Sequence, residues 1–387
     1  MKIKETVNEE TLIKTKHERN EGIELLRILV MFMVLLLHFN LNGGILFNNS
    51  LIDTLNYKLV WLVEAFSIVA VNCFVLISGY FLVNSKFKKQ KVYSLVLQVV
   101  SYSIVITILY TLITKNILNI GQYLECIFPI TFKTYWFITC YVILYLLIPY
   151  LNLIFEHTDK RKMQILIAIL CTVSFVSWIL NRFKFDAIDK TKGYGIIWVI
   201  NLYFIGGYIR KYYKDKYNKF YFLIIYIIFS LLIFTLKFIL LKINSNTIWI
   251  SDIFYEYNSV TVTIQSICLF MFLKDLKIKN EKIRKTILKI APLTLAVYII
   301  HEHPIVSKFL YKDWLHLNYF WNSKYYIIIT FLMSLAIYVV CCVIEYLRNI
   351  SMKRLEKLEA VHTHTQYILI NKRVGCILLK SATYFLN

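Results

Sequence analysis

Long apolar segments alternate with short polar segments along nearly the whole chain. About 20 apolar residues in a helix cross a hydrocarbon core of about 30 Å, and most of the apolar segments reach or approach that length. The pattern predicts an all-α fold, a polytopic membrane helix bundle of about ten transmembrane helices. We place the spans at residues 22–41, 59–83, 92–114, 135–154, 163–181, 195–209, 220–241, 258–273, 290–310 and 325–347.

Composition supports a membrane protein. The chain has 387 residues, of which 58% are hydrophobic and 16% aromatic, with 10 Gly and 4 Pro. Its mean hydropathy is +0.60, and no soluble globular domain needs so much apolar surface. The first 21 residues are polar, and no small-residue cleavage site follows the first apolar segment. We therefore expect that segment to act as an uncleaved insertion signal.

Positive charge is distributed unevenly between alternate loops. The net charge is +21, and most of the 44 Lys and Arg residues lie in segments on the side of the N-terminus. A nucleic-acid-binding protein would gather such residues on a soluble face, so we expect no nucleic-acid partner. Positive loops stay in the cytoplasm, which predicts a multi-pass plasma-membrane protein with both termini cytoplasmic.

Three regions are predicted from this arrangement. They are a cytoplasmic N-terminal segment at 1–21, one membrane domain at 22–347 and a cytoplasmic tail at 348–387. The tail begins with a charged stretch, Arg348 to Leu358, suited to a bilayer surface with anionic lipid.

Arg27 and His38 are the most informative polar residues of the first span. Eleven residues advance a helix by about 16 Å and close to three turns, so both side chains share one face. Glu24 lies one turn before Arg27 and could orient its guanidinium. His38 could act as a general base. Alternatively, Arg27 reaches lipid headgroups and His38 only forms a hydrogen bond inside the bundle.

Further polar residues lie in other predicted spans. Glu64 and Asn72 are eight residues apart, so they lie nearly on one helical face and line a cavity or form hydrogen bonds between helices. His301 and His303, with Glu302 between them, could suggest a metal site, but residues two apart on a helix face different ways, and no third ligand is evident. We expect no metal, and we interpret His301 as a hydrogen-bonding residue of an acceptor cavity.

Six segments resemble, in the same order, those of the acyltransferase-3 family. These integral membrane enzymes move acetyl or other acyl groups onto sugars and related acceptors. The resemblance covers roughly residues 20 to 350. The segments are Glu24-Leu-Leu-Arg27 with His38, Val71 to Phe81 with its Ser-Gly-Tyr, Tyr135-Trp-Phe137 with Leu147-Ile-Pro-Tyr150, Phe204-Ile-Gly-Gly-Tyr208, Leu295 to His301, and a last span ending at Glu345.

The resemblance implies transfer of an acetyl or similar acyl group from cytoplasmic acyl-CoA to a hydroxyl of a cell-envelope polysaccharide or its lipid-linked precursor. Acyl-CoA is then a donor substrate, and no permanently bound cofactor is implied. His38, Arg27 and Glu24 become the catalytic residues, with His38 as a general base or as a transient acyl carrier. The implied CoA-binding residues are Arg27, Lys86, Lys88, Lys89 and Lys91, and the implied acceptor-cavity residues are Glu64, Asn72, Ser78, Trp136 and His301.

One departure from the family concerns the lysines. Many members carry an arginine motif where this chain has Lys86 to Lys91, and lysine lacks the bidentate fork with which arginine binds phosphate. Two other functions remain open: a polysaccharide or acyl-group exporter, and a non-catalytic partner in a glycan synthase or export complex. Loss of acyl transfer in His38→Ala would distinguish the enzyme from both.

Overall fold

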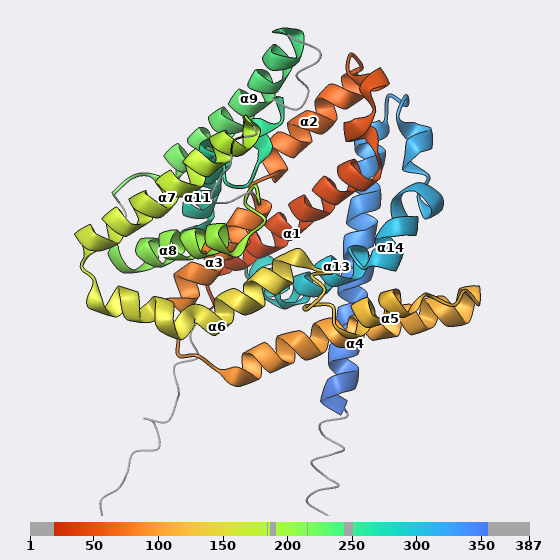
Figure 1. The fold of residues 1–387 in the computed structure, drawn as a ribbon, viewed down its shortest axis with the longest axis horizontal. Helices are drawn as coiled ribbons and strands as arrows, with labels where there is room; N and C mark the ends of the chain where they lie inside the picture. The colour runs from red at the N-terminus through yellow and green to blue at the C-terminus, as the bar shows by residue number, and fades with distance from the viewer. Residues whose placement is uncertain (1–18, 184, 186–190, 215, 244–250, 355–387) are drawn as a thin grey trace, which may run out of the picture. The chain divides into compact units, whose positions relative to one another are not determined.

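Helices joined by short loops make up the part of the chain that the structure describes (Figure 1). The computed structural model describes residues 19–183, 185, 191–214, 216–243 and 251–354. It divides into a first unit, Met1–Tyr338, and a second unit, Val339–Asn387. Most of the predicted N-terminal segment 1–21 and of the predicted tail 348–387 lies outside the described residues.

Seven segments of the described chain are long and apolar enough to span a membrane. They are Glu21–Asn42 (α1), Leu55–Leu82 (α2 and α3), Lys89–Thr114 (α4), Trp136–His157 (α6), Lys160–Arg182 (α7), Lys219–Ile243 (α9) and Tyr326–Arg354. Our prediction of an all-helical multi-pass membrane protein agrees with them. The predicted count of about ten spans and the cytoplasmic location of both termini are not confirmed.

Three predicted spans are not among the seven because their helices are short. Ile196–Tyr212 (α8) has 17 residues and Val260–Lys274 (α11) has 15. At 1.5 Å per residue these helices are about 26 and 23 Å long, less than the hydrocarbon core. The predicted span 290–310 contains Ala291–Leu293 (η6), Thr294–His301 (α13) and Pro304–Phe309 (α14).

The break between α13 and α14 has a local cause. Pro304 is the first residue of α14, a position where its missing N–H and fixed φ suit a helix start. The His303 side chain accepts a hydrogen bond from the N–H of Ile305 at 3.3 Å and so caps the new helix. The chain therefore turns at Glu302, which follows the last residue of α13.

The remaining elements connect or flank these helices. They are Ile45–Phe47 (η2), Asn49–Leu51 (η3), Ile120–Ile127 (α5), Ile253–Tyr255 (η5), Glu281–Ile290 (α12), the π-helix Leu310–Trp314 (η7) and Leu317–Phe320 (η8). The segment predicted as one span at 59–83 forms α2, Leu55–Ser67, and α3, Ala70–Leu82, with two residues between them.

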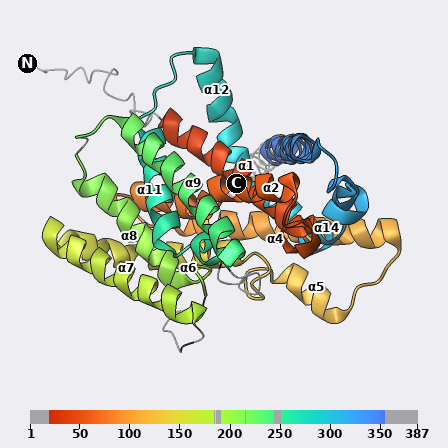
Figure 2. The ribbon, with the colours of Figure 1, turned by 90° about the horizontal axis from the view of Figure 1, so that it is seen from above.

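Helix α1 is central to the first unit and packs against α2, α3, α11, α12 and α13 (Figures 1 and 2). Its N-cap residue, Asn20, accepts a hydrogen bond from the N–H of Ile23 and donates one to the carbonyl of Lys274 at the end of α11. A Cβ on Gly22 would lie 2.0 Å from the carbonyl oxygen of Leu273, so the two backbones touch there. The start of α1 is thus fixed by backbone contact and by capping.

Helices α3 and α8 cross in direct backbone contact. A Cβ on Gly79 would lie 2.3 Å from the carbonyl oxygen of Tyr203, and a Cβ on Gly206 would lie 2.4 Å from that of Leu76. Small residues at such crossings let helix backbones approach closely in membranes. The Ser-Gly-Tyr segment and the Gly-Gly-Tyr segment, far apart in sequence, therefore pack on each other.

We expect Gly79→Ala to destabilise the fold, because the added methyl meets a backbone carbonyl that cannot rotate away. Overpacking of this kind costs about 1–3 kcal/mol, so the melting temperature and the yield of monodisperse protein should both fall. Fluorescence-detected size-exclusion chromatography after heating measures this effect. The matched control is Gly121→Ala in α5, where the new Cβ meets only the Asn119 side chain, at 3.2 Å. Equal melting of the two variants would contradict the interpretation.

Candidate active site

A cavity of about 1100 Å³ extends along α1 between Arg27 and His38. Both side chains line it, although eleven residues separate them, because they share one face of the helix. Other lining residues come from α3, α4, α6 and α13, among them Ser78, Lys91, Trp136 and Tyr298. The cavity brings cationic side chains at one end of α1 together with an imidazole near the other end.

Glu24 anchors the cationic end. Its carboxylate is buried, with a side-chain exposure of 6%, and pairs with Arg19 through contacts of 2.9 and 3.0 Å. Arg27 makes a longer contact with the same carboxylate, with its Nη1 3.4 Å from Glu24 Oε2. Arg19 makes the shorter contacts with Glu24. The Arg27 side chain is 33% exposed and lines the cavity, with its guanidinium 5.7 Å from the centre of the Phe81 ring.

Arg210 is a third guanidinium at this end, beside Arg19 and Arg27, and sequence reasoning missed it. It follows the Gly206-Gly-Tyr segment at the end of α8 and lines the cavity. Its Nη1 donates a hydrogen bond of 2.9 Å to the Tyr80 hydroxyl, and its guanidinium lies 4.8 Å from the centre of that ring. Of the four lysines predicted to bind CoA, the lining contains Lys91 but not Lys86, Lys88 or Lys89. Arg210 thus supplies a fork-shaped donor group that the lysine loop lacks.

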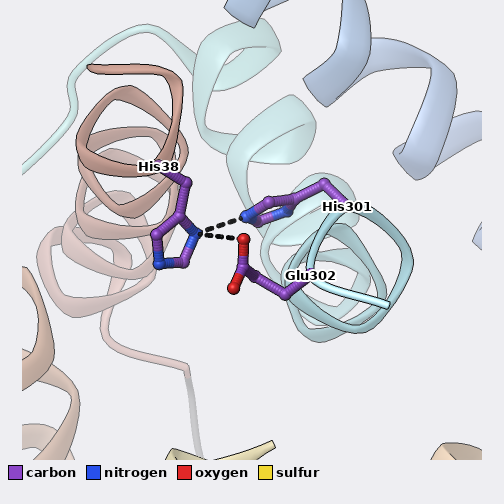
Figure 3. A group of neighbouring side chains, drawn as sticks. All are labelled: His38, His301 and Glu302. Carbon is purple, nitrogen blue, oxygen red and sulfur yellow. Dashed lines mark hydrogen bonds and ion pairs between the residues drawn. The ribbon is translucent and has the colours of Figure 1, made fainter. Parts of the chain in front are cut away.

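His38, His301 and Glu302 form a compact cluster between α1 and the turn after α13 (Figure 3). His38 Nδ1 lies 2.8 Å from His301 Nε2 and 3.2 Å from Glu302 Oε1. Asn42, one turn after His38, donates a hydrogen bond of 3.4 Å to the same carboxylate oxygen. Glu302 was not singled out from the sequence as a site residue. The only signal for it is its place directly after His301.

The hydrogen bonds of the cluster assign the tautomers of both neutral rings. A carbonyl oxygen only accepts, so His301 Nδ1 must donate its proton to the carbonyl of Val297. His301 Nε2 is then unprotonated and accepts a hydrogen bond from His38 Nδ1–H. His38 Nε2 is left with a free lone pair, on a side chain that lines the cavity. This is the arrangement of a general base whose second nitrogen is held by other groups.

The other predicted acceptor-cavity residues lie in different surroundings. Ser78 lines the cavity and donates a hydrogen bond of 2.9 Å to the Phe74 carbonyl, and Trp136 lines it in contact with the Tyr257 ring. Glu64 is buried and accepts a hydrogen bond of 2.8 Å from Asn40. Asn72 is buried as well, donating to the Tyr257 carbonyl at 2.9 Å and accepting from the Trp198 indole at 3.1 Å. Neither Glu64 nor Asn72 is part of the cavity lining.

A separate polar network lies between α7, α9 and the loop before α11. Lys237, fully buried, pairs with Asp252 and lies 3.3 Å from the centre of the Trp61 ring. Arg182 contacts Glu256 at 2.6 Å. Burial raises the pKa of the Glu256 carboxyl above its usual range, although Arg182 acts in the opposite direction. None of the four charged residues lines the cavity, so this network pairs charges away from the candidate site.

The family of the chain follows from sequence comparison. A family model described as an acyltransferase domain matches residues 20–346, a range that includes Arg27, His38, Arg210, His301 and Glu302. No curated protein matches the chain, and no solved structure does. Since the match extends over most of the chain, the protein belongs to the acyltransferase-3 family and is an acyltransferase of the multi-pass membrane type.

Proposed function

We propose that this protein transfers an acetyl or similar short acyl group from cytoplasmic acyl-CoA to a hydroxyl of an envelope polysaccharide or its lipid-linked precursor, in the plasma membrane. The observation that carries the proposal is the single cavity that joins guanidinium groups at one end to an unprotonated imidazole nitrogen near the other. Arginine is suited to the phosphates of CoA, and an imidazole is suited to a hydroxyl acceptor.

The donor has two features that match the cavity. Its phosphates carry several negative charges, which Arg27, Arg210 and Lys91 would meet at the cationic end. Its pantetheine arm is long and flexible, and the advance of about 16 Å from Arg27 to His38 along α1 is one that such an arm can bridge. The thioester carbonyl then lies near His38, in surroundings that limit its hydrolysis by water.

The proposed reaction balances with His38 as the only proton carrier. His38 Nε2 takes the proton of the acceptor hydroxyl while its oxygen attacks the thioester carbonyl. The carbon–sulfur bond breaks, and the proton passes from His38 to the leaving thiolate of CoA. During the reaction the ring is an imidazolium, whose Nδ1–H still donates to His301 Nε2 and whose positive charge lies next to the Glu302 carboxylate, with Nδ1 3.2 Å from Oε1. Glu302 is therefore a positioning residue that stabilises the charged ring.

We expect His38→Ala to lose acyl transfer by about 100- to 10,000-fold, the usual contribution of a general base. Transfer of labelled acetyl from acetyl-CoA to a crude envelope glycan, by purified protein in liposomes, measures the effect. Binding of CoA by the variant should change little. His157→Ala is the matched control, since His157 is an exposed residue at the end of α6, outside the cavity lining, whose ring bonds the Leu153 carbonyl of the same helix. Unchanged transfer in His38→Ala would refute the base assignment, and no transfer by well-folded wild type would favour an exporter.

Arg27→Gln should raise the KM for acyl-CoA about tenfold or more with a smaller effect on kcat, because the lost contact binds the donor before and during the reaction. Arg27→Lys, which keeps the charge and loses the fork, should have an intermediate KM. Initial rates against acyl-CoA concentration separate the two parameters. Arg161→Gln, at an exposed position of α7 outside the cavity lining, should behave as wild type. An unchanged KM in Arg27→Gln would place donor binding elsewhere.

Glu302→Gln should lower kcat about tenfold to a hundredfold and leave the KM for acyl-CoA near that of wild type. The amide keeps the shape of the side chain but no longer offers a charge to the imidazolium that forms during the reaction. The same initial-rate measurements test this split. A purely structural role of Glu302 would instead reduce the fraction of active protein, so titration of binding sites with labelled CoA is the control. An equal kcat in variant and wild type would contradict the role.

A further inference from the structure

We propose that His38, His301 and Glu302 also form a zinc site, and that a zinc ion bound there inhibits the transferase. The three ligand atoms are His38 Nδ1, His301 Nε2 and a Glu302 carboxylate oxygen, all within 4.8 Å of one another. His38 lies in α1. His301, 263 residues later in the sequence, is the last residue of α13, and Glu302 follows it. Two imidazoles and one carboxylate are an established ligand set for zinc with one open position.

The two distances from His38 Nδ1 to the other ligand atoms are close to those of a tetrahedral zinc site, and all three atoms lie within 4.8 Å of one another. Zinc bonds of about 2.0–2.1 Å place tetrahedral ligand atoms about 3.3 Å apart. The distance from His38 Nδ1 to Glu302 Oε1 is 3.2 Å, and that from His38 Nδ1 to His301 Nε2 is 2.8 Å. The two ring nitrogens, which now share a hydrogen bond, therefore need to move apart by about half an ångström to bind the same zinc ion.

The groups behind the ligands favour metal binding. Histidine ligands of metals usually donate their second ring N–H to a carbonyl, and His301 donates its Nδ1–H to Val297 in this way. Its Nε2 lone pair is consequently directed into the cluster. Asn42 donates a hydrogen bond to the Glu302 carboxylate. The side chains of His38 and Glu302 are 19% and 23% exposed, so two of the three ligands are partly accessible.

Zinc at this site would remove the proposed base. Bonds form from the ion to His38 Nδ1, His301 Nε2 and Glu302, and a water fills the fourth position. The proton on His38 Nδ1 leaves to solvent, and Nε2 takes up one proton, so the neutral ring ends with its proton on Nε2. No lone pair then remains toward the cavity to accept the proton of an acceptor hydroxyl. The inhibitory effect rests on the proposed function, whereas zinc binding itself does not.

The test compares zinc binding by the purified full chain and three variants after removal of metals with EDTA. Equilibrium dialysis against zinc chloride, read by elemental analysis, should show about one zinc ion fewer per chain for His301→Ala than for wild type. Glu302→Gln should bind that ion at least tenfold more weakly. His303→Asn is the matched control, because asparagine can keep the cap on Ile305 and His303 is not one of the ligands. Zinc bound by other cysteines and histidines of the chain contributes equally to wild type and variants, so it cancels in the difference between their stoichiometries.

Cobalt chloride provides a second measurement that does not depend on activity. Visible absorption bands of tetrahedral cobalt should appear in wild type and in His303→Asn and be absent in His301→Ala. Labelled acetyl transfer by wild type should fall at least tenfold with saturating zinc and return with EDTA. Equal zinc stoichiometry in wild type and His301→Ala would overturn the site, and zinc-loaded protein as fast as the EDTA-treated form would overturn the inhibition. Cobalt bands that are lost in His301→Ala, in a protein without transferase activity, would support the site and contradict the proposed function.

Discussion

The hydrogen bond between His38 and His301 is the contact on which the proposed chemistry of this protein depends. It joins α1 to the end of α13 and holds the two ring nitrogens 2.8 Å apart. Only one proton can lie between them. Since His301 uses its other nitrogen to bind Val297, that proton belongs to His38, and the free lone pair of His38 is fixed by a backbone carbonyl on a different helix. A change in how α13 ends would thus change the protonation of a residue on α1.

Helix α1 can carry both ends of the site because its position is fixed independently of the site. Contact between Gly22 and the Leu273 carbonyl sets its start, and contacts with α2, α3 and α13 follow along its length. A straight helix keeps the separation of Arg27 and His38 constant, which suits a substrate with its charge at one end and its reactive carbonyl at the other. The break of the 290–310 segment at Pro304 has a complementary effect, because it ends α13 at His301 and turns Glu302 toward His38.

Sequence reasoning reached those features that depend on local periodicity and composition. The helical class, the membrane spans of full length and the common face of Arg27 and His38 all follow from the 3.6-residue period and from the cost of polar groups in lipid. The predicted count of about ten spans is not confirmed, because α8 and α11 are apolar but shorter than the seven candidate spans, and length at a helix end depends on capping and packing. Residues whose role arises from contact across the chain were missed: Arg19 replaces Arg27 as the main partner of Glu24, and Glu302 reaches a histidine on another helix.

The same distinction explains why the sequence led us to expect no metal, whereas the geometry of the cluster leads us to propose a zinc site. Neighbouring histidines two residues apart cannot converge on one ion from a regular helix, and that argument still holds for His301 and His303, whose rings bind different groups. The proposed ligand that completes the set is His38, which lies 263 residues before His301 in the sequence, so no spacing rule could reveal it. His38 Nδ1 can carry the proton shared with His301 or, in its place, bind the proposed metal ion. Because binding of the ion moves the ring proton to Nε2, the proposed base is open to inhibition by the ion. Removing either His301 or Glu302 to prevent that inhibition would also remove the groups that orient the base, so the two properties are coupled by the geometry of the cluster itself.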